Sequence, residues 1–282
     1  MHAATNDAQI EQLATFVESK KDLVILTGAG CSTDSGIPDY RDELGAWKQN
    51  QPIQHQDFLN LAESRKRYWA RSMVGWRNFG TSKPNPAHYA LAKLESAGIA
   101  KLLVTQNVDG LHQAAGSQQV VDLHGRLDEV VCLDCQHRYP RRTIQQWLTS
   151  HNPSYAERIA GPAPDGDAHL EGKFEDFNIP DCQNCGGILK PDVVFFGDNV
   201  PRDKVDHVFQ EVQSCDGMLV VGTSLMVFSG FRFVRKAHEL GIGIAAINLG
   251  KTRADDLFDC KISGSCSTTL DRLLSRMGRQ DA

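Results

Sequence analysis

The chain has 282 residues, of which 41% are hydrophobic, and its formal net charge is −5. This length suits one large domain or two lobes of unequal size, with enough apolar residues for a sizeable core. The charge does not indicate a surface for specific nucleic-acid or membrane binding, and no apolar run approaches the roughly 20 residues that span a bilayer. Residues 1–7 show neither a signal nor a transit pattern, so we expect a cytoplasmic protein.

Apolar strands and amphipathic helices are predicted to alternate along the chain. A helix beginning near Asp7 comes first, and the buried strand Leu23–Thr27 follows it. Further strands are predicted at 102–105, 120–123, 217–221 and 244–247. Helices are predicted at 87–97, 204–214, 231–239 and 268–277. This alternation predicts an α/β fold with a Rossmann-like, doubly wound parallel sheet.

Two segments interrupt the alternation. Residues 42–85 are polar and partly helical, and residues 125–192 contain four paired cysteines. We expect them to form a smaller, helical and metal-binding lobe inserted into a large lobe. The large lobe would comprise about 7–41, 86–124 and 193–277, all within a single domain.

A glycine-rich turn, Gly28-Ala29-Gly30, follows the first predicted strand. Such a turn lets backbone N–H groups approach a phosphate at a helix start. As a dinucleotide fingerprint the turn is imperfect, because Thr33 replaces the third glycine of G-x-G-x-x-G. No acidic residue stands clearly at the position that binds ribose. An ordinary turn between a strand and a helix would also fit these residues.

Polar residues follow the next two predicted strands. The string Gln106-Asn107-Val108-Asp109 comes after one and His124 comes after the other. Carboxyl ends of parallel strands face the ligand crevice, and an imidazole with a pKa near ~6.5 can accept a proton at physiological pH. The string could instead cap a helix, and a lone histidine is more often structural. We interpret His88 and His112 as packing or surface residues.

Four of the eight cysteines form two C-x-x-C pairs, Cys132 with Cys135 and Cys182 with Cys185. Four thiolates complete a tetrahedral zinc site with no open position, so the metal would be structural. The 46 residues between the pairs exceed the common spacing, but Gly186-Gly187 suits the turn of a zinc knuckle. A redox role is the alternative, and two pairs without a thioredoxin-like context count against it.

Three later segments carry weaker signals. The apolar stretch Lys190–Asp198 reads as an edge strand that could pair with an extended peptide. The strings 221–225 and 248–250 each follow a predicted strand, where hydroxyl and amide groups can bind ribose oxygens. Cys266 comes after them.

Taken together, these motifs resemble the sirtuin family, in the family's order, from about Leu23 to Cys266. The most specific is the string Thr27–Arg41, in which Tyr40 stands where the family usually has Phe. Segments 52–55, 67–71, 162–167 and 190–198 resemble class II, the branch of mitochondrial lipoamidase and ADP-ribosyltransferase sirtuins. Asp198 stands where the substrate loop usually ends in Glu.

The resemblance implies roles for particular residues. Its catalytic positions correspond to His124, Asn107 and Gln106. Its NAD-binding positions correspond to Gly28, Ala29, Gly30, Ile37, Asp39, Tyr40, Arg41, Gln106, Asn107, Val108, Asp109, Gly222, Thr223, Ser224, Asn248, Leu249, Gly250 and Cys266. Its peptide-binding positions correspond to Val194, Phe195, Phe196 and Gly197. Its zinc ligands correspond to Cys132, Cys135, Cys182 and Cys185.

The activity implied is NAD-dependent removal of acyl groups from protein lysines, with NAD as co-substrate and one structural zinc ion per chain. The acyl oxygen attacks the carbon that loses nicotinamide, and His124 deprotonates a ribose hydroxyl, giving lysine, nicotinamide and O-acyl-ADP-ribose. Protein ADP-ribosylation would use the same site. A non-catalytic NAD sensor or zinc interaction module is a rival of another class, against which the intact His124, Asn107 and Asp109 count.

The sequence also suggests a preference among acyl groups. The Tyr-x-x-Arg pair that selects succinyl groups in desuccinylase sirtuins is not apparent, because the corresponding region, Gly45–Lys48, reads Gly-Ala-Trp-Lys. The long loop 151–180 could reach back over the acyl channel, or could be an ordinary surface excursion. We expect lipoyl, biotinyl or other long acyl groups to be preferred to acetyl.

Overall fold

The computed structural model describes residues 6–42, 44–48, 52–161, 163 and 165–278. Two positions of the class II segment 162–167, Pro162 and Pro164, lie outside the described residues. None of the helices in the described ranges is long and apolar enough to cross a membrane.

The larger of two sheets has six parallel strands in the order β3-β2-β1-β7-β8-β9. Its strands are β1 (Leu23–Thr27), β2 (Ala100–Thr105), β3 (Val120–Asp122), β7 (Gly217–Val221), β8 (Gly243–Ile247) and β9 (Cys260–Ile262). The strand order reverses next to β1, which is typical of doubly wound sheets. The predicted fold class is therefore confirmed, although β9 was not predicted.

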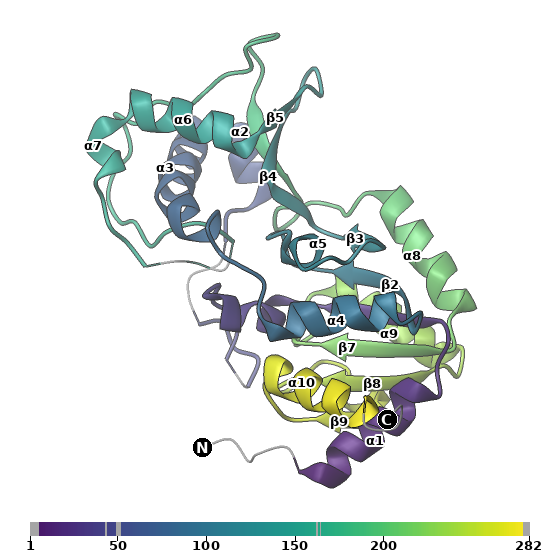
Figure 1. The fold of residues 1–282 in the computed structure, drawn as a ribbon. Coiled ribbons are helices and arrows are strands. Elements are labelled where there is room, and N and C mark those ends of the chain that lie inside the picture. Colours follow the sequence, from purple (N-terminus) through teal and green to yellow (C-terminus); the bar gives the residue numbers. More distant parts are fainter. Residues whose placement is uncertain (1–5, 43, 49–51, 162, 164, 279–282) are drawn as a thin grey trace.

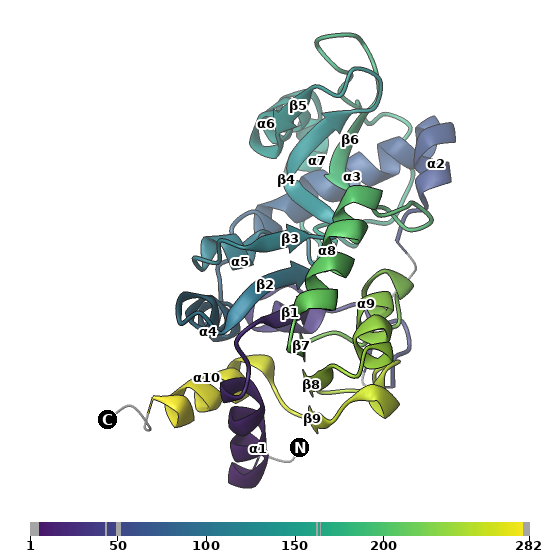
Figure 2. The same ribbon diagram turned by 90° about the vertical axis from the view of Figure 1, so that its right-hand side faces the viewer.

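Helices cover both faces of this sheet (Figures 1 and 2). One face carries α1 (Asp7–Glu18), α4 (Pro86–Ser96) and α10 (Cys266–Met277), and the other carries α8 (Arg202–Ser214) and α9 (Phe228–Glu239). The central strands β1 and β7 are continuous apolar runs, as expected for strands that are buried on both sides. Helix α9 begins three residues before the predicted start at 231, and Val227 at its N-cap makes no side-chain capping bond that could mark the start.

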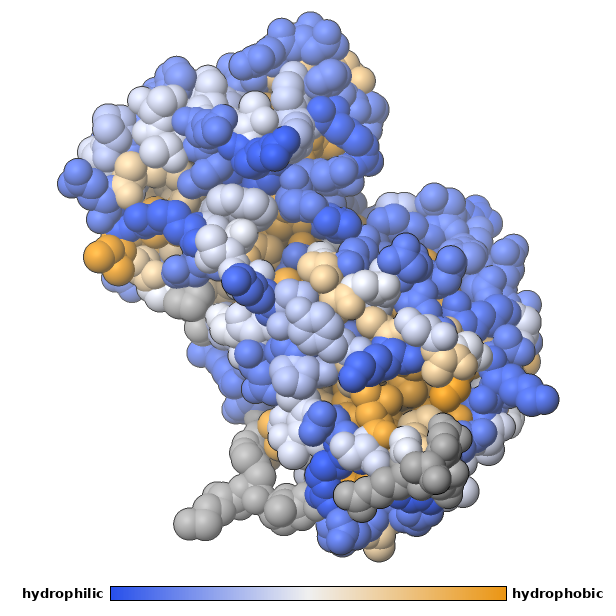
Figure 3. All heavy atoms as spheres, viewed as in Figure 1, coloured by the Kyte–Doolittle hydropathy of each residue, from blue (hydrophilic) through white to orange (hydrophobic). Residues whose placement is uncertain are grey.

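The smaller sheet has three antiparallel strands in the order β5-β4-β6. Its strands are β4 (Gly125–Cys132), β5 (Arg138–Pro140) and β6 (Leu189–Val193). It shares a third core with four helices, of which the sequence predicted only the two in 42–85, in outline. These helices are α2 (His55–Asn60), α3 (Ala62–Phe79), α6 (Arg141–His151) and α7 (Pro153–Ala156). The molecule narrows between the two sheets (Figure 3). The lobe boundaries given above stay a prediction.

The junction between the sheets places two segments of the site. Strand β4 begins directly after His124, and β6 ends directly before Val194. The Val194 N–H donates to the His124 carbonyl over 2.8 Å. Gly125 has φ +81°, and a Cβ there would lie 2.0 Å from the Asp192 carbonyl oxygen. Only glycine allows β4 and β6 to approach so closely at this point.

Candidate active site

A cavity of about 550 Å³ runs along the carboxyl ends of β1, β2, β7 and β8 and reaches the start of β4. All of the residues predicted above as catalytic, NAD-binding or peptide-binding line this cavity. The sequence therefore identified these lining residues correctly, although the role of each residue stays a prediction.

Further short helices lie in the connections of the large sheet. They are α5 (Leu111–Ala114), η1 (Ala29–Cys31), η2 (Thr33–Ser35) and η3 (Asp255–Leu257).

The floor of the cavity is made of main chain. The Gly30 N–H donates to the Gly222 carbonyl over 2.8 Å, so the turns after β1 and β7 touch directly. A Cβ on Gly222, at φ +62°, would lie 2.3 Å from the Cys31 nitrogen, and one on Gly28 would lie 2.6 Å from the Thr223 Cβ. The chain continues from Gly28 into η1, a short 3₁₀ helix, and not into the full α-helix of a standard dinucleotide turn.

A polar network occupies the end of β2. Asp109 accepts from the Leu111 N–H at Oδ1 over 2.9 Å and from the Ser32 hydroxyl at Oδ2 over 2.7 Å. Asn107 Nδ2 donates to the Gly28 carbonyl and to Ser32 Oγ over 3.1 and 3.0 Å. Burial raises the pKa of Asp109. Ser32 was not predicted as a site residue, although it lies inside the most specific string of the sequence.

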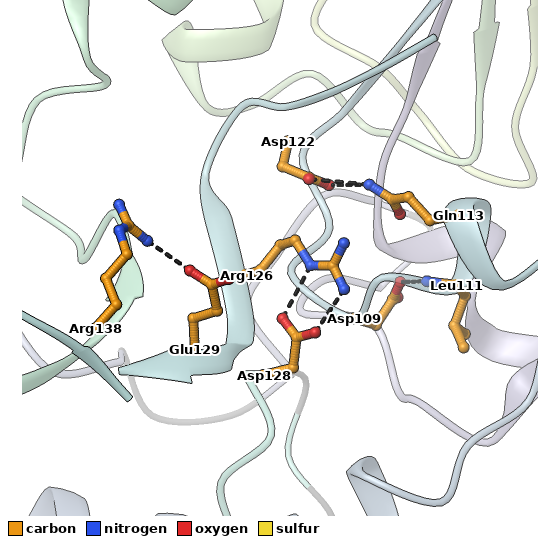
Figure 4. Close-up of polar contacts among 8 residues, drawn as sticks. All are labelled: Asp109, Leu111, Gln113, Asp122, Arg126, Asp128, Glu129 and Arg138. Carbon is orange, nitrogen blue, oxygen red and sulfur yellow. Dashed lines mark hydrogen bonds and ion pairs between the residues drawn. The ribbon is translucent and has the colours of Figure 1, made fainter. Parts of the chain in front are cut away.

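Further polar contacts hold the connection from β2 to β4 in place (Figure 4). Gln113 Nε2 donates to both carboxylate oxygens of Asp122 over 3.0 and 2.9 Å. Arg126 forms a two-point contact with Asp128 over 2.9 and 2.5 Å, next to Asp109 in the view. These contacts hold the connections that contain Asp109, after β2, and His124, between β3 and β4.

His124 is held by both of its ring nitrogens. Nδ1 lies 2.9 Å from the Gln106 carbonyl, which can only accept, so Nδ1 carries the proton. Nε2 then presents a lone pair, which accepts from the Ser229 hydroxyl over 2.8 Å. Burial lowers the pKa of His124 to about 4, and the charges of Arg232 and Lys204 contribute to this lowering. The hydrogen bond to the Gln106 carbonyl acts in the opposite direction. The imidazole is therefore neutral at physiological pH.

Gln106 connects the histidine to the floor. Its side-chain Oε1 accepts from the Thr223 hydroxyl over 2.8 Å, while its main-chain oxygen orients His124. A Cβ on Gly230 would meet the Gln106 amide at 2.8 Å, so the first turn of α9 packs directly on Gln106. Ser229 and Gly230 were missed by sequence reasoning, because only the packing of α9 against β2 brings them to the site.

The segment Val194–Gly197 forms the opposite wall. The predicted edge strand 190–198 ends as a strand at Val193, and the chain continues into the wall with Gly197 at φ +81°. The Phe196 ring lies 6.2 Å from Tyr40 and 5.6 Å from Trp47, measured between centroids. Phe195 turns the other way and packs on Phe58 and Tyr68, in the core of the small sheet.

The expectation that the chain has no Tyr-x-x-Arg pair was wrong, because Tyr68 and Arg71 have this spacing. Both residues lie on α3, which approaches the cavity from the small sheet, and Tyr68 lines it. Arg71 Nε donates to the Ala168 carbonyl over 3.0 Å and lies 3.7 Å from Asp167 Oδ2. Asp165 also lines the cavity, and burial raises the pKa of both aspartates.

The four paired cysteines meet at the far end of the small sheet, with their sulfur atoms within 4.8 Å of one another. Sγ of Cys132 lies 3.5 Å from Sγ of Cys185, and Sγ of Cys135 lies 3.7 Å from Sγ of Cys182. Zinc with four sulfur ligands at about 2.3 Å requires sulfur–sulfur distances of about 3.8 Å. The predicted grouping is confirmed, and the donor set fits a structural zinc ion.

His88 and His112 are buried behind the network at Asp109, so the packing interpretation is the correct one. Their rings lie 4.8 Å apart, and burial lowers their pKa values to about 4 and about 3. Cys31 lies within 4.8 Å of both, a grouping that the sequence did not suggest.

The Sir2 family model matches residues 28–229, which include the cavity floor, the network at Asp109, His124 and the four cysteines. The chain belongs to the Sir2 family. Two similar bacterial proteins are called NAD-dependent protein deacetylase. The one from Xanthomonas campestris pv. campestris (strain 8004) is 56% identical, over 92% of this chain and 88% of its own length. The one from Bordetella bronchiseptica is 54% identical, over 95% and 98%.

Other Sir2 relatives extend the comparison to mitochondria and to solved structures. The bovine NAD-dependent protein lipoamidase sirtuin-4 is 48% identical, over 93% of this chain and 84% of its own length. A Sir2 structure with a p53 peptide and NAD+ has a TM-score of 0.77 at 29% identity, covering 96% of this chain and 99% of that one. Family membership and fold are thus shown by independent comparisons.

Proposed function

We propose that this Sir2 chain is an NAD-dependent protein-lysine deacylase. The observation that carries the proposal is the neutral His124, whose Nε2 lone pair faces the cavity between the network at Asp109 and the wall Val194–Gly197. A deacylase of this type needs a base next to the ribose, with nicotinamide on one side and acyl-lysine on the other. Relatives at 54–56% identity that carry the name NAD-dependent protein deacetylase support it.

In this proposal the glycine floor accepts the NAD phosphates, because no side chain separates main-chain N–H groups from the ligand. Asp109 and the Val108 main chain hold the nicotinamide carboxamide, while Gln106 and Asn107 face the ribose. The adenosine half extends toward Ser224, Asn248 and Cys266, beyond the end of β8. NAD is consumed as a substrate, and the chain supplies orientation and dipoles.

His124 accepts the proton of a ribose hydroxyl at Nε2. That hydroxyl replaces the Ser229 hydroxyl as the partner of the lone pair, and the proton on Nδ1 stays with the Gln106 carbonyl. The carbonyl favours the protonated ring, so it stabilises the charge that develops as the proton arrives. Gln106 and Asn107 orient their dipoles toward the ribose carbon that loses nicotinamide.

We propose further that long acyl groups are good substrates. The acyl channel leads from His124 toward Leu127, Phe79 and Tyr68, apolar or aromatic residues that line the inner end of the cavity. Each CH₂ buried there contributes roughly 0.8 kcal/mol. The identity of 48% with a lipoamidase supports a lipoyl substrate.

Mass spectrometry of NAD and one acyl-lysine peptide after incubation with the chain tests the proposal. Formation of nicotinamide, O-acyl-ADP-ribose and free lysine in equal amounts is the expected result. Transfer of ADP-ribose to the peptide or to the chain itself would identify an ADP-ribosyltransferase. An unchanged mixture would indicate a protein without catalytic activity, such as an NAD sensor.

A further inference from the structure

Arg232 lines the cavity on the side of α9. It lies one turn after Ser229 on the same face of the helix, and Ser229 is the hydrogen-bond partner of His124. Among the described residues no ion pair joins the Arg232 guanidinium to an acidic group, and its Nε is buried without a hydrogen-bond partner. By contrast, Arg235 on the same helix pairs with Glu239 over 3.4 Å.

The Arg232 guanidinium lies in the cavity wall and is partly withdrawn from water. The Arg232 guanidinium lies over the Phe228 and Phe233 rings, 5.4 and 6.0 Å from their centroids, and burial lowers its pKa. Removing a charge from water without a partner destabilises it, and a planar guanidinium matches a carboxylate at two points. The arrangement therefore suits an anionic ligand that arrives from outside.

The position of Arg232 separates it from the expected phosphate site. Cys31, which follows the glycine floor, belongs to the core beneath α1, α4 and α10. Phe233 and Val234, the neighbours of Arg232, belong to the core on the opposite face, beneath α8 and α9. The guanidinium lies in the part of the cavity near His124, because Ser229 one turn away bonds His124 and the Arg232 charge acts on that imidazole.

Two exposed apolar side chains mark a peptide path beside Arg232. Val227 and Phe228 are 37% and 45% exposed, and both line the cavity. The segment Val194–Val200 lines the cavity too, so a chain that brings an acyl-lysine to His124 passes between these two segments. A side chain next to the acyl-lysine would then meet the Arg232 guanidinium.

We propose that Arg232 selects protein substrates with an acidic residue next to the acyl-lysine. The carboxylate would supply the partner that the guanidinium lacks. This inference rests on the proposed deacylase function and adds a substrate class to it. Arg232 is a specificity residue here, and takes no part in the proton transfer at His124.

The test uses peptides that differ only in Glu, Gln or Lys on either side of one octanoyl-lysine. For the unaltered chain, kcat/KM with Glu should exceed kcat/KM with Lys by about tenfold, through KM, because a charged hydrogen bond contributes on the order of 1.5 kcal/mol. Arg232→Gln should bring the ratio near one, and Arg232→Glu should reverse it. Arg235→Gln, on the next turn, should keep the ratio of the unaltered chain.

Fluorescence anisotropy of the same labelled peptides, without NAD, separates this inference from the proposed function. A chain that binds acidic peptides through Arg232 but releases no nicotinamide would contradict the deacylase proposal alone. Equal binding and turnover of all three peptides would overturn the role of Arg232. So would a rise in KM for NAD in Arg232→Gln with an unchanged peptide ratio, which would assign the guanidinium to a phosphate.

Discussion

His124 Nε2 and Ser229 Oγ lie 2.8 Å apart, although 105 residues separate them in the chain. The contact joins the end of β3 to the first turn of α9. It shows which nitrogen of His124 has the lone pair, because Nδ1 is committed to the Gln106 carbonyl. Ser229 therefore fills the place that a substrate hydroxyl would take.

Replacing His124 should remove most of the activity. We expect His124→Ala or His124→Tyr to reduce deacylation by roughly 10² to 10⁴, because a general base contributes about that much. Formation of free lysine and O-acyl-ADP-ribose, together with circular dichroism, is the check, because His124 acts after nicotinamide has left. Ser229→Ala is the matched variant and should retain most turnover, since a substrate hydroxyl replaces Ser229. Normal turnover by purified His124→Ala would show that another group accepts the proton of the ribose hydroxyl.

Replacing one cysteine of the zinc site should release the metal. We expect one zinc ion per unaltered chain, and none in Cys182→Ser, with the thermal midpoint lowered by roughly 10 °C because zinc binding contributes to folding. Elemental analysis and calorimetry measure both effects. Cys215→Ser is the control, because Cys215 is a buried thiol at the end of α8, away from the four ligands. A zinc-free native chain would show that the cysteines serve another purpose.

Acid should destabilise the chain, because three buried neutral histidines outweigh the buried Asp109, Asp165 and Asp167, whose raised pKa values act in the opposite direction. Burial lowers the pKa values of His88 and His124 to about 4 and of His112 to about 3, from an ordinary value of 6.5. Between pH 6.5 and about 4 the unfolded chain binds more protons than the native chain. Its free energy of unfolding should therefore fall as the pH falls, by on the order of 1.4 kcal/mol per pH unit for each histidine.

Urea unfolding at pH 7, 6 and 5 measures this slope, and a chromophoric chelator in the same samples reports any zinc release. The free energy of unfolding should begin to decrease at a pH at which zinc is still bound. A free energy of unfolding that is flat from pH 7 to 5 would contradict the prediction that the three histidines outweigh the buried aspartates.

The acyl preference should depend on the acidic residues near Tyr68. We expect kcat/KM to rise from acetyl to octanoyl to lipoyl peptides, and succinyl to be the poorest, because its carboxylate would meet Asp165, and Arg71 already lies 3.7 Å from Asp167. Asp165→Asn should raise the ratio of succinyl to acetyl turnover. Adding Arg71→Gln to that variant should remove the gain. Acetyl peptides cleaved as well as lipoyl peptides would indicate an ordinary deacetylase.

Local patterns were enough to predict most of this architecture. Strand β1 is recognisable as a continuous apolar run before glycines. The spacing of the two C-x-x-C pairs is enough to predict that their four thiolates meet at one metal ion. Strand β9 was missed because Cys260–Ile262 is only three residues long and alternates apolar with charged. Ser229 and Arg232 were missed for another reason: each is a single polar residue on an amphipathic helix, and only the packing of α9 against β2 brings it to the cavity.

The contact between Gly30 and Gly222 limits how this enzyme can diverge. The cavity floor consists of two main-chain turns in direct contact, and a side chain on Gly222 would collide with the backbone at Cys31. Residue substitution there cannot make NAD binding gradually tighter or weaker, since any added atom separates the turns. We expect variation among relatives in affinity for the nucleotide to arise instead at rim positions such as Lys48, Leu249 and Lys251, whose side chains are exposed.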